Sequence, residues 1–172
     1  MTLNTTQNQR PHRYRFDASV LRTESGMINH YLPIPEEIGA ALWDAGVRRV
    51  IATLNGKDFR RALIGRGDGT RCLILGGPLL REIGARMGDM VSVSLVADPD
   101  PDRVDLPEEF AAVLEQDDEA MARFASMTSG MQRSLALHVA SAKREETRIK
   151  RALELAYKLR TRTLHGDRGN EG

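Results

Sequence analysis

The sequence contains a single cysteine, Cys72, and this scarcity excludes several classes of protein. One thiol cannot form an internal disulfide or a zinc site with several cysteines, so a reducing cytoplasm is the expected compartment. The longest apolar stretches, such as residues 38–43, are far shorter than the roughly 20 residues that a transmembrane helix needs. Residues 1–13 are polar and lack the apolar segment of a signal peptide. The sequence therefore predicts a soluble, cytoplasmic, globular protein.

Aromatic residues are also few, at 5% of the 172 residues, and neither sign of charge dominates. Lys and Arg number 25 against 24 Asp and Glu, and the net charge of +1 excludes a globally basic nucleic-acid binder. So few aromatics leave no stacking platform for single strands, and no helix-turn-helix or RNA-recognition signature occurs. Nucleic-acid binding stays a minor alternative, through the C-terminal helix and a basic hairpin cluster: Arg48, Arg49, Lys57, Arg60, Arg61, Arg66 and Arg71.

Residues 13–106 are predicted to form a β domain, because short apolar segments are divided there by turn residues. The Asn55-Gly56 pair suits a tight hairpin turn between antiparallel strands at 47–54 and 59–64. The glycines of residues 65–69 and 76–77 fit no P-loop or dinucleotide fingerprint, so they are interpreted as turns.

Two short helices are expected inside this domain, one from Pro35 to Gly46 and one from Pro78 to Gly88. Proline suits the first turn of a helix, and glycine suits its end. Each helix precedes a strand, so the repeated layout suggests a pseudo-duplication. The predicted fold is α+β, with a small closed β-barrel of about six to seven strands, since closure removes exposed strand edges.

Residues 107–164 are predicted to form a helical C-terminal region, and residues 1–12 and 165–172 to be disordered tails. The boundary falls inside an acidic segment, residues 98–119, which holds ten acidic residues and one basic residue. Thr128 and Ser129 can cap one helix. The last helix, residues 143–162, has eight basic and three acidic residues, with an apolar stripe at helical spacing. The stripe comprises Ile149, Ala152, Leu153, Ala156 and Leu159.

Two stretches of the sequence resemble known families. The stretch from HYLPIPEEIG through VRRVIATLNGKDFRRALIGRGDGT to GDMVSVSL resembles domain of unknown function 1905. That resemblance implies a small closed barrel. The stretch SAKREETRIKRALELAYKL resembles the YdeI/OmpD-associated, or bacteriocin-protection, proteins of bacteria. The two resemblances cover roughly residues 14 to 160 and imply a phenotype, without an enzymatic reaction.

The candidate binding residues fall into two sets. Lys143, Thr147, Arg148 and Arg151 are spaced three and four apart on the last helix, where they can converge on an anion or a partner together with Arg60. The alternative is that these arginines hold the helix onto the acidic segment or the β domain. Tyr31, Trp43 and Phe59 are candidates for lining a pocket, with ordinary packing as the alternative.

Candidates for catalysis are scarce. The four histidines are scattered, and no spacing of histidine or cysteine supports a metal site. Cys72 is expected to be a buried, unreactive thiol. We therefore predict no catalytic residue, metal or cofactor, and a non-enzymatic protein that binds a small ligand or a partner protein. The alternative is an enzyme or carrier for a small anionic metabolite, with Arg60 and Arg148 as a clamp.

Overall fold

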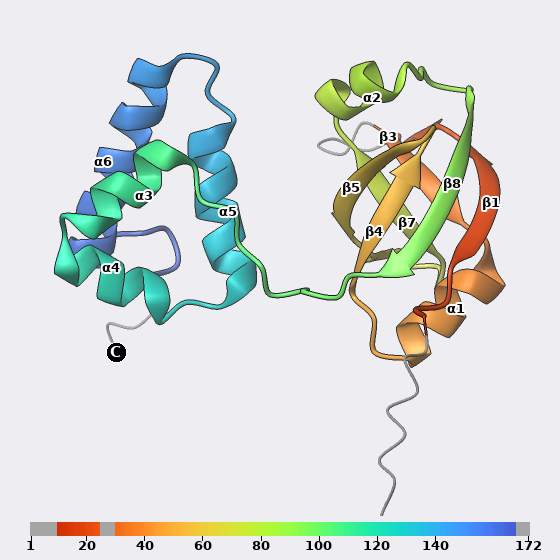
Figure 1. Ribbon diagram of the computed structural model, residues 1–172, viewed down its shortest axis with the longest axis horizontal. Helices are drawn as coiled ribbons and strands as arrows, with labels where there is room; N and C mark the ends of the chain where they lie inside the picture. The colour runs from red at the N-terminus through yellow and green to blue at the C-terminus, as the bar shows by residue number, and fades with distance from the viewer. Residues whose placement is uncertain (1–9, 25–29, 168–172) are drawn as a thin grey trace, which may run out of the picture. The chain divides into compact units, whose positions relative to one another are not determined.

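The computed structural model describes residues 10–24 and 30–167 (Figure 1). The chain divides into two compact units, residues 1–101 and residues 102–172, here called the first and second unit. The disordered tails predicted at 1–12 and 165–172 lie outside the described residues, apart from 10–12 and 165–167.

Within residues 10–24 and 30–101, the first unit contains two antiparallel four-stranded sheets and two helices. The first sheet has the strand order β1-β8-β4-β5, and the second has the order β2-β3-β7-β6. The strands are β1 (Tyr14–Ser19), β2 (Leu21–Arg22), β3 (His30–Ile34), β4 (Arg49–Leu54), β5 (Lys57–Ala62), β6 (Ile64–Gly65), β7 (Arg71–Leu75) and β8 (Met90–Ala97). The helices are α1 (Glu36–Asp44) and α2 (Gly77–Ile83), at opposite ends of the strands in Figure 1.

The α+β class is as predicted, but the closed barrel is wrong: the described strands form two open sheets. The chain passes from one sheet to the other at two buried corners, Val20 and Leu63. The amide of Val20 donates to the carbonyl of Asp89 at 2.9 Å, and that of Leu63 to the carbonyl of Arg48 at 2.8 Å. Both bonds go to residues just before strands of the first sheet. Each corner thus turns the chain without joining the edges of the two sheets in a ladder, so the described edges stay open.

The repeated layout of the sequence has a counterpart in the pairing of the strands. Each half runs from a strand of the second sheet through a helix to a strand of the first sheet: β3-α1-β4 and β7-α2-β8. Moreover, β3 pairs antiparallel with β7, and β4 pairs antiparallel with β8. Antiparallel pairing of equivalent strands is what a local two-fold relation between the two halves produces.

The hairpin predicted at Asn55-Gly56 is confirmed, with positive φ angles of 47° and 84°. The predicted end of the second helix at Gly88 is wrong, because the helix ends at Gly84, whose φ of 68° stops it earlier. The amides of Gly84 and Ala85 donate to the last helical carbonyls, which closes the helix with the usual left-handed glycine cap.

The core of the first unit lies between the two sheets. Alternate residues of the strands point inward, and the following are almost completely buried: Leu32, Val50, Ala52, Leu54, Leu73, Leu75, Val91, Val93 and Leu95. The other face of each strand therefore lies outside this core, and on the second sheet that outer face is also partly apolar.

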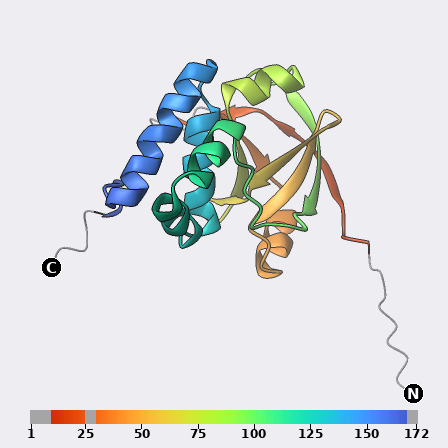
Figure 2. The same ribbon diagram turned by 60° about the vertical axis from the view of Figure 1, so that its left-hand side comes forward.

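The second unit consists of four helices (Figure 2). They are α3 (Glu108–Glu115), α4 (Asp118–Ala125), α5 (Ser129–Ala140) and α6 (Glu145–Thr161). The predicted cap of α5 is confirmed, because the Thr128 hydroxyl accepts from the amide of Met131 at 3.3 Å. Phe110, Leu114 and Phe124 form the core of this unit together with residues from α6.

The predicted apolar stripe of α6 is only partly the buried face. Ala152, Ala156 and Leu159 are buried as expected, but Leu155 joins them and was missed. Ile149 and Leu153, which the stripe includes, are exposed. The apolar arc of the helix is wider than the face that packs on α3, α4 and α5, so sequence spacing alone selected the wrong edge of the arc.

Candidate ligand pocket

A hollow of about 580 Å³ lies on the outer face of the second sheet. Its floor consists of the outward-facing side chains Tyr31 of β3, Cys72 and Ile74 of β7, and Ile64 of β6. The register explains this grouping, because Tyr31 lies opposite Ile74 and Ile64 lies opposite Cys72. Residues distant in the sequence thus form one continuous, largely apolar floor.

Arg66 covers one side of this floor. Its Nη1 donates to the Tyr31 hydroxyl at 2.9 Å, and its guanidinium carbon lies 4.4 Å from the centre of the Tyr31 ring. A guanidinium at this distance is attracted to the negative face of the ring. The pair therefore places a positive charge directly over an aromatic ring.

The turn between β6 and β7 holds Arg66 in place. The amide of Arg66 donates to the carbonyl of Thr70 at 2.8 Å, and the amide of Gly69 donates to the carbonyl of Arg66 at 3.0 Å. The Asp68 carboxylate accepts from both the amide and the hydroxyl of Thr70. These bonds with Thr70 lower the pKa of Asp68, so the turn keeps its carboxylate at neutral pH. The glycine-rich segment is thus a structured hairpin turn.

The opposite wall of the pocket comes from Arg22, the last residue of β2, and from Thr23 and Glu24, which follow it. The hydroxyl oxygen of Thr23 is buried and has no hydrogen-bond partner among the described residues. Arg22 is exposed and adds a second positive charge beside it.

Cys72 lies in the floor and is 4% exposed. Burial is the main cause that raises the pKa of its thiol above the ordinary value of 9.0, and the nearby Arg66 opposes it. At neutral pH the thiol is therefore protonated and a poor nucleophile. This arrangement agrees with the expectation of an unreactive cysteine and favours binding over covalent chemistry in the pocket.

Of the three aromatic residues predicted to line a pocket, the structure places Tyr31 in this one. Trp43 instead lies under the guanidinium groups of Arg48 and Arg71, at 3.7 and 4.9 Å from the ring centre. Phe59 packs against the core of the first unit, with Arg61 beside its ring.

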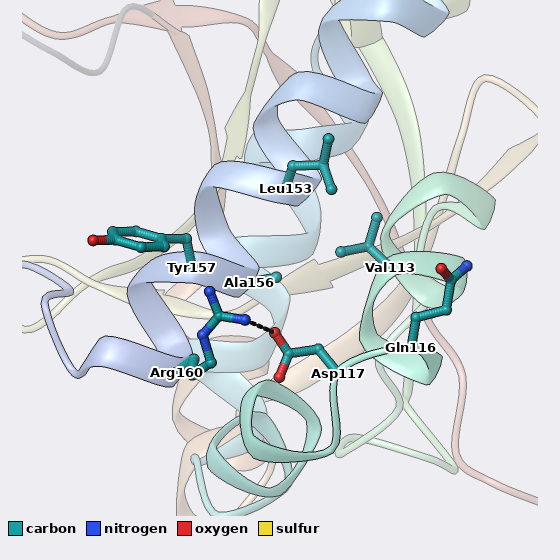
Figure 3. Close-up of a pocket in the computed structure, with 7 residues that line it drawn as sticks. All are labelled: Val113, Gln116, Asp117, Leu153, Ala156, Tyr157 and Arg160. Atoms are coloured by element: carbon teal, nitrogen blue, oxygen red, sulfur yellow. Dashed lines mark hydrogen bonds and ion pairs between the residues drawn. The ribbon is translucent and has the colours of Figure 1, made fainter.

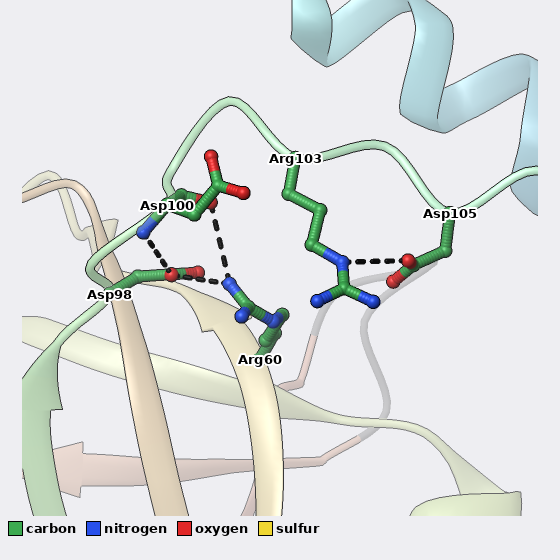
Figure 4. A network of polar contacts seen from close by, with 5 residues as sticks. All are labelled: Arg60, Asp98, Asp100, Arg103 and Asp105. Carbon is green, nitrogen blue, oxygen red and sulfur yellow. Dashed lines mark hydrogen bonds and ion pairs between the residues drawn. The ribbon is translucent and has the colours of Figure 1, made fainter.

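The side chain of Arg60, on β5, contacts residues that follow β8 (Figure 4). Its guanidinium forms an ion pair with Asp98 and also donates to the carbonyl of Asp100 at 3.3 Å. Two other cations of the basic hairpin cluster are also constrained by the fold. Lys57 donates to the carbonyl of Glu82 at 2.9 Å. Arg61 is partly buried, and this burial lowers the pKa of its guanidinium. These contacts hold β5 to its neighbours.

The cations predicted on α6 lie in the second unit and make contacts within it. Arg148 pairs with Glu109 of α3 at 2.6 Å, and Arg151 donates to the carbonyl of His138 at 2.8 Å. The helix begins at Glu145 and not at the predicted residue 143, so exposed Lys143 precedes α6, whereas half-buried Thr147 lies in its first turn. Arg148 therefore holds α6 to the acidic segment, as the alternative interpretation of these arginines predicted. The clamp of Arg60 and Arg148 stays a prediction, and it would require both ion pairs to open.

Of the residues that line this pocket, the sequence predicted only Tyr31 as a pocket residue; the polar side chains that it missed include Arg22, Thr23 and Arg66. Arg66 was visible as a cation inside a glycine-rich turn, but nothing local connects that turn with Tyr31. Among residues 10–24 and 30–167, no group of three or more His, Cys, Asp or Glu side chains could hold a metal ion.

Two protein-family models match parts of the chain, one in each unit. The model of the family described as domain of unknown function (DUF1905) matches residues 16–95. The model of the family described as bacteriocin-protection, YdeI or OmpD-associated matches residues 103–161. The two matches lie in this order along the chain. Both matches confirm the resemblances inferred from the sequence motifs.

The DUF1905 segment contains every residue of the pocket, and the bacteriocin-protection segment contains all four helices of the second unit. No curated protein matches the chain. In the part of the chain that the structure describes, no helix has the length and hydropathy needed to cross a lipid bilayer.

Proposed function

We propose that the chain is a non-enzymatic binding protein whose DUF1905 segment holds a small ligand in the pocket over Tyr31. The ligand has a flat or apolar body and an anionic group. The observation that carries this proposal is the arrangement of Arg66, fixed over Tyr31 at the edge of an apolar floor.

The lining of the pocket supports this class of ligand. Tyr31, Ile64 and Ile74 offer apolar surface to a flat body, while Arg22 and Arg66 offer charge to a carboxylate or phosphate. The volume of about 580 Å³ is within the range of small-molecule sites, which is roughly 300–1,000 Å³.

The absence of an activated nucleophile in this pocket argues for binding without catalysis. Burial keeps the Cys72 thiol protonated, and Glu24 is the one acidic side chain among the described residues of the lining. A buried, unpaired cysteine is also consistent with the reducing cytoplasm that we propose as the compartment. The family description of the second unit names protection against bacteriocins, which is compatible with a binding role and specifies no ligand.

Isothermal titration calorimetry with defined probes tests the proposal. Benzoate and phenyl phosphate should bind, whereas neutral benzyl alcohol should bind at least about tenfold more weakly because it offers no charge to Arg66. Arg66→Ala should weaken binding of both anions by about tenfold. Arg86→Ala removes an exposed arginine outside the pocket and serves as the matched control. Equal affinities for wild type and Arg66→Ala would refute the proposal.

A further inference from the structure

The α6 helix carries an apolar face that the other helices of the second unit leave exposed over much of its surface. Ile149, Leu153 and Tyr157 are 40%, 55% and 58% exposed. They are spaced four residues apart, so they form a continuous ridge along one side of the helix. A contiguous exposed apolar patch with a polar rim is typical of a surface that binds a partner.

A shallow groove of about 240 Å³ lies beside this ridge. Val113, Gln116 and Asp117 form its other side, and Leu153 and Val113 face each other across it (Figure 3). The ridge and the groove together offer a partner helix both a protruding and a receiving surface.

The charges at the two ends of the ridge are opposite. Glu146 lies seven residues before Leu153, and Arg160 lies seven residues after it. Seven residues are close to two helical turns, so both charged residues lie on the side of the helix that carries Leu153. The ridge is thus apolar in the middle and basic at its end, and it carries Glu146 at its beginning, with Lys150 on its flank one turn further on.

We propose that this face pairs with the same face of a second copy of the chain, with the two α6 helices antiparallel around a two-fold axis at Leu153. In this arrangement Leu153 meets Leu153 of the copy, and Ile149 meets Tyr157. Glu146 meets Arg160 at both ends, so the surface is complementary to itself. A parallel pairing would instead place Glu146 against Glu146 and Arg160 against Arg160, which is repulsive.

Arg160 retains the capacity for this contact. It donates through Nη1 to the Asp117 carboxylate at 3.1 Å, and its side chain is 46% exposed. A guanidinium has five N–H donors, so a second carboxylate can bind without breaking the pair with Asp117. Asp117 in turn fixes the position of Arg160 next to the ridge.

Cross-linking gives the sharpest test. In a Cys72→Ser background, Leu153→Cys should form a disulfide-linked dimer on mild oxidation, because the two-fold axis brings the two introduced thiols together. Leu137→Cys, on the exposed face of α5, is the matched control and should remain monomeric, since Leu137 is 68% exposed and lies off the ridge. Cross-linking of both variants at the same rate would overturn the proposal, as would cross-linking of neither.

Sedimentation velocity of the full chain over about a hundredfold range of concentration measures the association itself. Leu153→Glu should lower the association constant by about tenfold or more, because each dimer acquires two charges in its apolar centre. Glu146→Lys should lower it by about fivefold, while Glu154→Lys, on the flank of α6, should not. A wild-type monomer at every concentration contradicts the proposal, and so does a dimer that Leu153→Glu leaves intact, which indicates a different interface.

Discussion

Asp98 is the charged residue that is buried among the described residues, with a side chain only 1% exposed. Its Oδ1 accepts from Arg60 and from the amide of Asp100, whereas its Oδ2 has no hydrogen-bond partner. A buried carboxylate with one unpaired oxygen depends strongly on the cation beside it. Arg60 therefore stabilises the last turn of the first unit.

Arg60→Ala should lower the free energy of unfolding by about 2 kcal/mol, because it leaves the Asp98 carboxylate buried without its partner. This cost is smaller than that of breaking a fully buried pair, since the Arg60 side chain is 30% exposed. Urea denaturation measures it, with Arg86→Ala as the control. If Arg60→Ala behaves like the control, the contact with Asp98 contributes no stability and the arginine is available for a ligand.

Glu109 links pH to the stability of the second unit. The hydrogen bond from Arg148 is the main cause that lowers the pKa of Glu109 below its ordinary value of 4.5. A carboxyl whose pKa is lower in the folded state stabilises the fold above its unfolded pKa. That contribution is lost as the pH falls through the folded pKa.

The thermal stability of the wild type should therefore decrease more steeply below about pH 4.5 than that of Glu109→Gln. The two proteins should differ most near pH 7 and converge in acid. Melting temperatures between pH 7 and pH 3 test this. Parallel curves for the two proteins would show that the ion pair contributes nothing.

The Cys72 thiol should react slowly with iodoacetamide at pH 7, and its rate should still be rising above pH 9 because burial raises its pKa. Mass spectrometry measures the rate at one site, since the chain has a single cysteine. Rapid alkylation at pH 7 with a plateau near neutrality would identify an activated thiol and favour an enzyme.

The faces of α6 illustrate what helical spacing predicts and what it leaves open. The spacing identifies a helix and its apolar arc, yet the arc holds two edges, one around Leu155 and one around Leu153. Which edge is buried depends on where Phe110 and Phe124 of other helices stand. That information is not local to α6, so sequence reasoning included Leu153 in the core and omitted Leu155.

Leu155→Ala should lower the free energy of unfolding by about 2–4 kcal/mol, because it leaves a cavity in the core of the second unit. Leu153→Ala should change it by less than about 0.5 kcal/mol when measured at dilute, monomeric concentration. The two leucines lie on the same helix, so each is the control for the other. Equal costs would mean that the assignment of faces is wrong.

The strands of the first unit show a similar division. The hairpin at Asn55-Gly56 was predictable because its turn residues and alternation are local. Whether the sheets close into a barrel could not be predicted in the same way. It depends on whether the chain pairs the edges of the two sheets at the corners Val20 and Leu63 or only bends there. Asn55 adds a contact that no spacing reveals: its side chain donates to the carbonyl of Ile83 and accepts from the amide of Ser92.

For the whole molecule, the order of the two families was evident from motifs, and each unit has its own hydrophobic core. The pocket was only partly predictable. Tyr31 was identified as an aromatic candidate, but Arg66 reaches it only because β3 pairs with β7 and β7 with β6. Arg60 and Arg148 were predicted from the sequence as anion-binding cations. In the structure they form ion pairs with Asp98 and Glu109.

The most direct test of the ligand pocket is protection of Cys72 from iodoacetamide at pH 9, measured by mass spectrometry in the presence of phenyl phosphate. The thiol lies in the pocket floor, so an occupied pocket should slow its alkylation by about tenfold or more at saturation. Arg66→Ala should need about tenfold more phenyl phosphate to reach the same protection. Benzyl alcohol at the same concentration should protect far less. An alkylation rate that neither benzoate nor phenyl phosphate changes would contradict the assignment of this pocket as the binding site.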